Sequence, residues 1–231
     1  MISSVSGYHD VESGEAKGYG MLKVSDIMSK CDDFKVTDDT QITYQCTSFG
    51  KIYSKMINEF IMSMFGQKIN FKDIMMKDRL KFIFPEEKQV LESHLGNTVN
   101  CLKLREDFWL NQNDFPKFLF HKYEYKDTAE NYARNVHHSK VMVIKDKNQE
   151  VGDQTAIYVG SHNMSGGAWG TLQRYGKTLY TGNYELGVFF RPREGTKEMK
   201  QRIMKSLMFK TDPTPYNLKV DKPYLFKKDD F

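Results

Sequence analysis

Residues 137–144 (His-His-Ser-Lys-Val-Met-Val-Ile) and 155–167 (Thr-Ala-Ile-Tyr-Val-Gly-Ser-His-Asn-Met-Ser-Gly-Gly) are the most informative stretches of the sequence. In each, a short apolar run adjoins a polar cluster, which precedes the run in the first stretch and follows it in the second. The apolar runs predict strands over 140–144 and 155–160 that are covered on both faces. Strands of this kind are typical of an α/β fold built in layers.

Strands and helices alternate in the N-terminal part of the chain as well. Residues 41–47 suit a strand, and the residues after it are apolar at helical spacing, which predicts a helix whose apolar face meets the core. The apolar positions of this helix are Ile52, Met56, Phe60 and Met64. The methionines expected to pack in the core are Met56, Met64, Met75 and Met76.

The remaining elements follow the same alternation. A short strand over 81–85 precedes a helix over 86–95, and a further strand is expected over 184–190. We expect a helix over 197–209 with its lysines outward and an extended tail from about residue 212. Residues 97–136 show no clear period. The residues expected to face inward on the last helix are Met199, Ile203 and Leu207.

Size and composition fit an ordinary folded domain. The chain has 231 residues, of which 39% are hydrophobic and 28% charged, and its net charge is +4. This mild basic bias tolerates a polyanionic partner but is also that of many mixed-charge surfaces. Because the sequence contains neither an internal repeat nor a linker, we expect one domain over 1–231.

Cysteine use and hydropathy bear on the compartment. The three cysteines are widely spaced and odd in number, which argues against a disulfide-stabilised secreted domain. No run approaches the roughly 20 apolar residues of a membrane span, and the N-terminus lacks the features of a signal peptide. The sequence therefore favours an intracellular, soluble protein without a membrane partner.

The polar clusters contain candidate catalytic residues. Alternation along a strand puts His138 and Lys140 on one face, where an imidazole and an ammonium could meet a phosphate together. Asn163 follows the next strand, in a turn rich in Gly and Ser that suits an anion. An ammonium, an amide and backbone N–H groups can stabilise phosphoryl transfer without a metal, and histidine can exchange a proton near neutral pH.

Each of these residues also has an ordinary structural explanation. His-x-Lys is common, Gly-Ser-x-Asn is often only a turn, and most histidines are structural or exposed. The adjacent His137 and His138 could form a surface pair or bind zinc, but no Cys or carboxylate cluster at metal spacing supports a zinc site.

His138-x-Lys140, followed after a strand by Gly160-Ser161-x-Asn163, resembles the HxK...GSxN signature of the phospholipase D superfamily. At the place where the standard motif has an Asp, this chain has Lys145. That departure matches the tyrosyl-DNA phosphodiesterase branch, which also lacks the Asp. The resemblance implies a phospholipase D-like mixed sheet with helices on both faces.

Other segments are similar to the second half of tyrosyl-DNA phosphodiesterases. Residues 163–170 (Asn-Met-Ser-Gly-Gly-Ala-Trp-Gly) resemble their Asn-Leu-Ser-x-x-Ala-Trp-Gly run, and residues 184–188 (Tyr-Glu-Leu-Gly-Val) match one of their strands. Weaker agreement comes from residues 45–50, 120–122 and 215–218. The chain therefore resembles the C-terminal half of such an enzyme.

The resemblance implies a role for each matched residue. His138 would be the general acid/base, Lys140 and Asn163 would hold the phosphate, and Glu185 would orient a histidine of the other half. That other histidine would be the nucleophile and form a phosphohistidine. The DNA backbone would be contacted by Ser48, Phe49, Gly50, Lys51 and Ser165. Trp169 is expected in the core rather than as a surface for base stacking.

The implied substrate is DNA with a tyrosine or peptide of topoisomerase I on a 3'-phosphate, or a related 3' adduct, on single or double strands. Such enzymes act in DNA repair in the nucleus and use no metal or other cofactor. Only one His-Lys-Asn set occurs in this chain, so we expect an inactive half that needs the N-terminal half as its partner. Surface that meets the partner should be exposed and apolar.

Three alternatives remain open at this point. A homodimeric single-motif nuclease of the same superfamily would complete the site by two-fold symmetry. A non-catalytic nucleic-acid-binding module could retain the fold and bind phosphate. A general phospholipase is disfavoured by Lys145 and by the Ala-Trp-Gly run.

Overall fold

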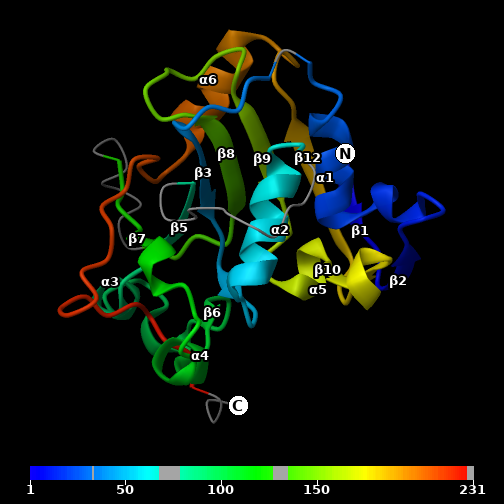
Figure 1. The fold of residues 1–231 in the computed structure, drawn as a ribbon. Helices are drawn as coiled ribbons and strands as arrows, with labels where there is room; N and C mark the ends of the chain where they lie inside the picture. The colour runs from blue at the N-terminus through cyan, green and yellow to red at the C-terminus, as the bar shows by residue number, and fades with distance from the viewer. Residues whose placement is uncertain (33, 68–78, 127–134, 228–231) are drawn as a thin grey trace.

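The chain folds around a seven-stranded mixed sheet (Figure 1). The computed structural model describes residues 1–32, 34–67, 79–126 and 135–227, so Met75 and Met76 lie outside the described residues. In spatial order the strands of this sheet are β1 (Ile2–Ser4), β12 (Glu185–Phe190), β9 (Ala156–Gly160), β8 (Lys140–Asp146), β3 (Thr40–Gln45), β5 (Leu80–Phe84) and β7 (Phe120–Lys122). Neighbouring strands are antiparallel from β1 to β3 and parallel from β3 to β7.

Two smaller sheets flank the large one. Their strands are β10 (Thr171–Gln173), β11 (Thr178–Thr181) and β2 (Gly7–Asp10) in one, and β4 (Ser48–Phe49) and β6 (Lys103–Leu104) in the other. The helices are α1 (Gly20–Met28), α2 (Ser54–Met64), α3 (Glu87–Leu91), α4 (Glu106–Asn111), α5 (Gly166–Trp169) and α6 (Lys197–Ser206). Short 3-10 helices lie at Glu15–Gly18, Gly96–Thr98, Lys117–Leu119 and Arg174–Gly176.

One face of the large sheet is covered by α1 and α2, which pack against each other in front of the strands (Figure 1). The apolar face of α2 is buried there, as its helical spacing predicted. At the centre, Trp169 packs edge-on against Tyr44 and Tyr158 and donates its Nε1–H to the Tyr44 hydroxyl at 3.0 Å. Trp169 has no exposed surface, so the expectation that it belongs to the core is confirmed.

The opposite face is covered over only part of the sheet. Ile83, Val141 and Val143 are buried against Leu207 and Phe209, which follow α6, with α6 itself contributing Met204. Helices therefore flank both faces, as expected for this fold class. On β9 and β12, however, apolar side chains of this second face remain exposed: 38% for Val159, 56% for Leu186 and 48% for Val188.

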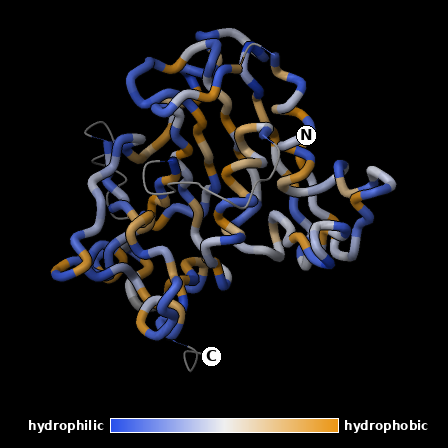
Figure 2. Tube along the Cα trace, viewed as in Figure 1, coloured by the Kyte–Doolittle hydropathy of each residue, from blue (hydrophilic) through white to orange (hydrophobic). Residues whose placement is uncertain are grey.

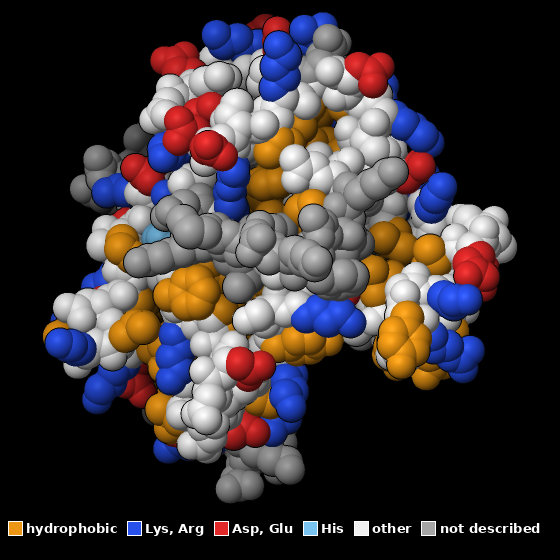
Figure 3. Space-filling view, in the orientation of Figure 1, with side chains coloured by type: hydrophobic (Ala, Val, Ile, Leu, Met, Phe, Trp, Pro, Cys, Tyr) orange, Lys and Arg blue, Asp and Glu red, His pale blue; other side chains and the backbone are white. Residues whose placement is uncertain are grey.

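The surface view agrees with the mild net charge. Figure 2 shows hydrophobic residues concentrated on the central strands, with mostly hydrophilic loops around them. In Figure 3, basic and acidic side chains alternate around the rim of the molecule instead of gathering in one basic patch on the visible face. The visible face therefore has no single basic region that would attract a polyanion by charge alone.

The expected strands over 140–144, 155–160 and 184–190 correspond to β8, β9 and β12. The strand expected over 41–47 ends at Gln45, because the backbone N–H groups of Thr47 and Ser48 bond to a side chain instead of a neighbouring strand. The helix expected over 86–95 ends at Leu91 and is followed by a turn.

The expectation that all lysines of α6 point outward was wrong. Lys200 is completely buried, while Met199 and Ile203 are only half-buried. The Lys200 ammonium donates to the backbone carbonyl oxygen of Arg191 at 3.2 Å, just after β12, and to that of Asp153 at 3.5 Å. Burial lowers its pKa. This buried lysine ties α6 to the loops at one end of the sheet.

The segments that the sequence left undetermined lie along the β7 edge of the sheet. Residues 97–126 supply β6, α4 and β7, and Trp109 and Phe115 pack on Phe120. The tail from 212 is irregular but not free. Its Tyr216 is buried and donates to the backbone oxygen of Phe84 at 3.0 Å.

Candidate active site

The sheet topology brings four chain segments to the same end of the large sheet. β3 and β9 end there, while β8 and β12 begin there, because both pairs of neighbours are antiparallel. Lys140 pairs with Gly160, and Gly160 in turn pairs with Gly187 of β12. Polar residues just outside these strand ends are therefore neighbours, although they are far apart in the sequence.

Lys140 opens β8 and is 96% buried, with 4% of its surface exposed. Its ammonium donates to the backbone oxygen of His138 at 2.8 Å, which ties the two residues together. Burial lowers the pKa of Lys140, and the nearby Cys46, Cys101 and Glu185 act in the opposite direction. A partly desolvated ammonium interacts strongly with an arriving phosphate.

His138 is exposed just before β8. Burial, and then the positive charge of Lys140, lower its pKa below the ordinary value of 6.5. In the free protein at neutral pH the imidazole is therefore mainly uncharged. A phosphate bound beside it would favour the protonated form, because an opposite charge raises a histidine pKa.

Asn163 is fixed by the turn that follows β3. Its Oδ1 accepts the backbone N–H of Thr47 at 3.2 Å and of Ser48 at 3.0 Å, and it also accepts the Thr47 hydroxyl at 3.3 Å. Backbone N–H groups can only donate, so the oxygen of the amide must face them. The Nδ2 amine then becomes the end of the side chain that can donate to an anion.

Glu185 begins β12 at the same end of the sheet. One of its oxygens accepts the Ser161 hydroxyl, and the other accepts Nδ2 of Asn183 at 2.9 Å. Its negative charge acts to raise the pKa of the nearby Lys140. A carboxylate held at both oxygens keeps a fixed direction and retains lone pairs for a further donor, such as an imidazole N–H.

The turn after β3 is joined to the turn after β9. The N–H of Met164 donates to the Ser48 oxygen at 3.2 Å, and the N–H of Gly50 donates to the Met164 oxygen at 3.0 Å. Ser165 follows directly, and its hydroxyl accepts the backbone N–H of Ala168 at 3.1 Å at the start of α5. A Cβ on Gly50 would lie 2.8 Å from the Ser165 Cβ, so only glycine fits there.

Four of the five residues expected to contact DNA lie at this junction with accessible surface. Ser48, Gly50 and Ser165 are half-buried and Lys51 is exposed. The Phe49 side chain is instead buried among the rings of Phe82, Phe84 and Phe120. Only the backbone of Phe49 remains available for a contact, since strand alternation turns its ring into the core.

His162, inside the Gly-Ser-x-Asn motif, is a structural histidine. It is completely buried and packs against Trp169, with ring centroids 4.4 Å apart and the rings tilted by 33°. It also hydrogen-bonds to the hydroxyls of Tyr158 and, at 3.1 Å, Ser4. Burial lowers its pKa to about 3, so it stays uncharged. This neutral histidine holds the chain between β9 and Asn163.

Several residues of the site escaped the sequence analysis. Thr47 supplies two of the three donors to Asn163, and Ser161 and Asn183 fix Glu185. Gln45 accepts the Ser139 hydroxyl at 2.8 Å and so ties the ends of β3 and β8 together. Each of these adjoins a motif residue, which was the available signal, but their pairing depends on strand register.

Lys145 stands where the wider superfamily has an Asp. Its ammonium donates to the backbone oxygens of Asp146 at 2.9 Å and Gln149 at 2.8 Å, at the far end of β8 from the site. It therefore closes the turn between β8 and β9, at the opposite end of β8 from Lys140.

The described part of the chain contains no helix that is long and apolar enough to cross a bilayer, and no group of three or more side chains there could hold a metal ion together.

Comparison with known proteins identifies the family. The family model of tyrosyl-DNA phosphodiesterases matches residues 1–225. The chain belongs to this family. Among solved structures, the yeast tyrosyl-DNA phosphodiesterase aligns with a TM-score of 0.63 at 17% identity, over 97% of this chain and 56% of that chain. Two histidine mutants of the yeast enzyme align with TM-scores of 0.62 and 0.63 at 19% identity, with the same coverage.

These matches confirm the family and the fold class. They also show that the chain spans 56% of the length of the yeast tyrosyl-DNA phosphodiesterase. A search of curated proteins found no match to the sequence.

Proposed function

We propose that this chain supplies the general acid/base half of a phosphodiesterase that hydrolyses the 3'-phosphotyrosyl bond between DNA and a topoisomerase-derived tyrosine or peptide. The observation that carries the proposal is that four polar residues lie at the same end of the sheet: His138, Lys140, Asn163 and Glu185. The side-chain oxygen of Asn163 already accepts hydrogen bonds from the turn after β3. The amide NH2 group of Asn163 can therefore donate to a phosphate that lies beside the buried ammonium of Lys140.

The chemistry follows from the character of each group. Lys140 and Nδ2 of Asn163 donate to the non-bridging phosphate oxygens and stabilise the charge of the transition state. A nucleophilic histidine of the other half attacks phosphorus and displaces the tyrosine oxygen, which takes its proton from His138. Neutral His138 then removes a proton from water, which attacks the phosphohistidine and releases DNA with a 3'-phosphate.

The nucleophile is assigned to an N-terminal half that acts as the partner of this chain. Two observations support the assignment: the chain covers 56% of its yeast relative, and the β9–β12 face exposes Val159, Leu186 and Val188. Contiguous exposed aliphatic side chains on a sheet are typical of an interface. We further propose that Glu185 hydrogen-bonds to the nucleophilic histidine and fixes its tautomer.

DNA is proposed to lie along the junction of the two turns. Ser48, Gly50, Lys51 and Ser165 can reach backbone phosphates through hydroxyl, N–H and ammonium groups, and Phe49 can do so only through its backbone. Contacts of this kind position a strand without reading its sequence. Since the proposed substrate is DNA under repair, we also propose a nuclear location.

The decisive experiment measures tyrosine release from a 3'-phosphotyrosyl single strand in EDTA, with the pure chain alone and after addition of a separately made N-terminal half. We expect release only on mixing, and loss of release with His138→Ala or Lys140→Ala. Lys147→Ala, at the opposite end of β8, is the matched control and should keep the rate of the unaltered chain.

The other outcomes discriminate between functions. Release by the chain alone, together with a stable dimer in sedimentation, would replace the proposal with a homodimeric nuclease. DNA binding that is insensitive to both alanine variants, without release on mixing, would replace it with a non-catalytic binding module.

A further inference from the structure

The segment that carries His138 has no regular secondary structure of its own. Residues 135–139 form neither helix nor strand, and His138 is exposed within them, just before β8. A histidine that transfers protons must nevertheless keep one direction, because a misplacement of about 1 Å costs roughly a hundredfold in rate. The direction of His138 therefore depends on how the residues on either side of it are held.

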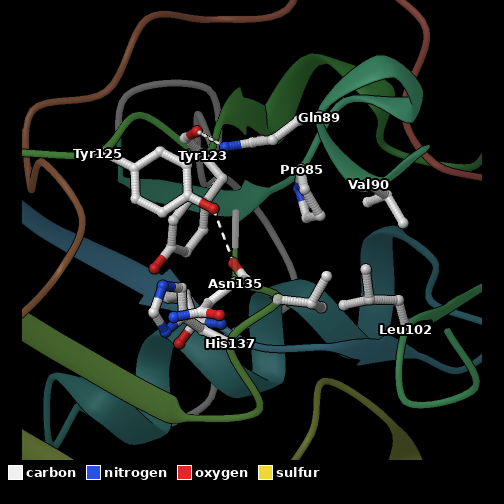
Figure 4. A pocket seen from close by; sticks show the side chains of 10 residues that line it. Pro85, Gln89, Val90, Leu102, Tyr123, Tyr125, Asn135 and His137 are labelled. Carbon is white, nitrogen blue, oxygen red and sulfur yellow. Dashed lines mark hydrogen bonds between the residues drawn. The ribbon is translucent and has the colours of Figure 1, made fainter. Parts of the chain in front are cut away.

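On the N-terminal side, two tyrosines hold the ring of His137 (Figure 4). His137 lies nearly parallel to Tyr123, with ring centroids 5.4 Å apart and an angle of 14° between the rings. It meets Tyr125 edge-on, with centroids 5.8 Å apart and an angle of 61°. Tyr125 also donates its hydroxyl to the backbone oxygen of Asn135 at 2.8 Å, the dashed line between them in Figure 4. Two ring contacts and one hydrogen bond thus fix the chain directly before His138.

The rings have little freedom to move. They face Pro85, Val90 and Leu102 across a space of about 20 Å³, which is room for about one water molecule. Burial lowers the pKa of His137, so its ring is uncharged at neutral pH and gains little by turning toward solvent. The His137 ring therefore keeps one orientation.

The two tyrosines are themselves attached to the framework of the large sheet. The N–H of Tyr123 donates to the backbone oxygen of Phe84, at the end of β5, at 3.0 Å. The backbone oxygen of Tyr123 accepts the side-chain amide of Gln89 at 3.0 Å. Tyr125 forms a β-bridge with Phe209. Their positions are thus set by the fold and not by the segment that they contact.

On the C-terminal side, His138 is followed by two further attachments. The Ser139 hydroxyl donates to the side-chain oxygen of Gln45 at 2.8 Å. The Lys140 ammonium donates to the backbone oxygen of His138 itself at 2.8 Å. With His137 held in front, the backbone of His138 is fixed from both sides, and the direction of its imidazole depends on all of these contacts.

The contact between Tyr123 and His137 is made by the rings and not by their polar ends. Tyr123 Oη and His137 Nε2 are buried without a hydrogen-bond partner among the described residues. A buried polar atom without a partner costs about 1–3 kcal/mol. Phenylalanine at either position would keep the ring contact without this cost, and it is therefore the conservative replacement.

We propose that Tyr123 and Tyr125 are positioning residues for His138: they hold His137, and through it the backbone that directs the His138 imidazole at the phosphate. This inference rests on the proposed function, in which His138 is the general acid/base. Loss of the positioning should slow proton transfer and leave the affinity for substrate unchanged, because Lys140 and Asn163 still hold the phosphate.

The first test measures tyrosine release by the mixture with the N-terminal half. His137→Ala removes the ring that the tyrosines hold and should lower kcat about tenfold with KM unchanged. His137→Phe keeps a ring between them and should retain kcat within about twofold. Tyr8→Ala is the matched control, since Tyr8 and Tyr180 form a ring pair on the small sheet, with centroids 4.9 Å apart. It should leave kcat unchanged.

The second test titrates the His138 imidazole by NMR in the chain alone and needs no activity. In the unaltered chain burial and Lys140 lower the pKa of His138. In His137→Ala this pKa should rise toward the ordinary value of 6.5, because the imidazole leaves its partly buried place, and His137→Phe should keep it low. Tyr125→Phe removes only the hydrogen bond to Asn135, so it should fold and show a smaller rise with a smaller loss of kcat.

The outcomes separate this inference from the proposed function. If the unaltered chain releases no tyrosine on mixing, the proposed function fails, and the titration still decides whether the tyrosines position His138. Unchanged kcat and unchanged His138 pKa in His137→Ala would overturn the positioning role. An equal loss of kcat in His137→Phe and His137→Ala would also overturn it, and so would a raised KM with unchanged kcat, which would make His137 a substrate-binding residue.

Discussion

At the scale of single residues, His138 connects the fold to the proposed chemistry through its pKa. Burial and Lys140 both lower that pKa, and a bound phosphate should raise it. We predict that His138 titrates below 6.5 in the free chain and that its pKa rises in Lys140→Ala and, separately, on addition of a 3'-phosphorylated strand. Titration of the imidazole signals by NMR measures all three. A strand that leaves the His138 titration unchanged would contradict the assignment of His138 to the phosphate site.

His162 predicts how stability depends on pH. Its pKa is about 3 in the folded chain, against 6.5 for an ordinary histidine. Between these values the unfolded chain binds a proton that the folded chain excludes, so stability is lost as the pH falls through this window. The free energy of unfolding should decrease by up to about 1.4 kcal/mol per pH unit from this residue alone.

Urea denaturation at successive pH values below 6.5 tests the His162 contribution. His162→Gln should show a shallower pH dependence than the unaltered chain, whatever its absolute stability. The same slope in both proteins would mean that His162 is protonated in the folded state.

At the scale of elements, substitutions at the junction of the turns after β3 and β9 should affect stability and binding separately. Asn163→Ala removes the acceptor of two backbone N–H groups and should cost about 1–3 kcal/mol of unfolding free energy. Asn163→Asp keeps an acceptor for Thr47 and Ser48 but puts a negative oxygen where the amine was. We expect near-normal stability with lost affinity for a 3'-phosphorylated strand.

Thermal melts measure the stability of the two Asn163 variants, and fluorescence anisotropy measures their affinity for a 3'-phosphorylated strand. If Asn163→Asp binds the strand as tightly as the unaltered chain, the amine does not hold the phosphate. The residue would then serve only to join the two turns.

The pairing of β9 with β12 requires glycine where the Tyr158 side chain crosses. A Cβ on Gly187 would lie 2.3 Å from the Tyr158 ring, and one on Gly160 would meet the Tyr158 hydroxyl. Gly187→Ala should destabilise the chain by about 1–3 kcal/mol or more, because the ring is enclosed and cannot move aside. Val188→Ala, one residue along on the exposed face, is the control. Equal midpoints of denaturation would show that the sheet accommodates the methyl group.

The sequence predicted these elements unevenly, for physical reasons. The strands at 140–144, 155–160 and 184–190 are apolar runs buried by neighbours on both sides, so their local pattern suffices. Lys200 breaks its helical pattern because loop carbonyls distant in sequence receive its ammonium. Phe49 adjoins residues expected at the DNA, but strand alternation, which its motif does not reveal, turns its ring into the core.

The candidate site shows the same division. Similarity to a family pointed to His138, Lys140, Asn163 and Glu185, and the strand topology brings these residues to the same end of the sheet. Their supports could not be foreseen, since the pairing of Thr47 with Asn163 depends on how the ends of β3 and β9 meet. Register between distant strands is a tertiary property, and local periodicity carries no information about it.

At the scale of the whole molecule, the sheet is covered unequally. One face is closed by α1 and α2, and the other is closed only where α6 and the residues after it reach. β9 and β12 lie beyond that cover, and their aliphatic side chains meet solvent. A sheet face of this kind buries its apolar side chains once a second body packs on it.

We therefore predict that the β9–β12 face carries the contact with the N-terminal half. Leu186→Lys combined with Val188→Lys should leave the melting temperature nearly unchanged, because both side chains are about half exposed already. An exposed apolar face also favours self-association of the isolated chain. The same variant should therefore reduce self-association in sedimentation and prevent the tyrosine release expected on mixing with the N-terminal half. Charged groups at the centre of an apolar contact lose their hydration without compensation.

Val220→Lys is the matched control, since Val220 is more exposed than either residue but belongs to the tail. It should leave both self-association and the mixed activity unaltered. If the double variant still forms an active mixture, the partner packs elsewhere, and the exposed aliphatic residues of β9 and β12 have another role. If the control is equally damaging, added charge is responsible in both variants, and neither result locates the interface.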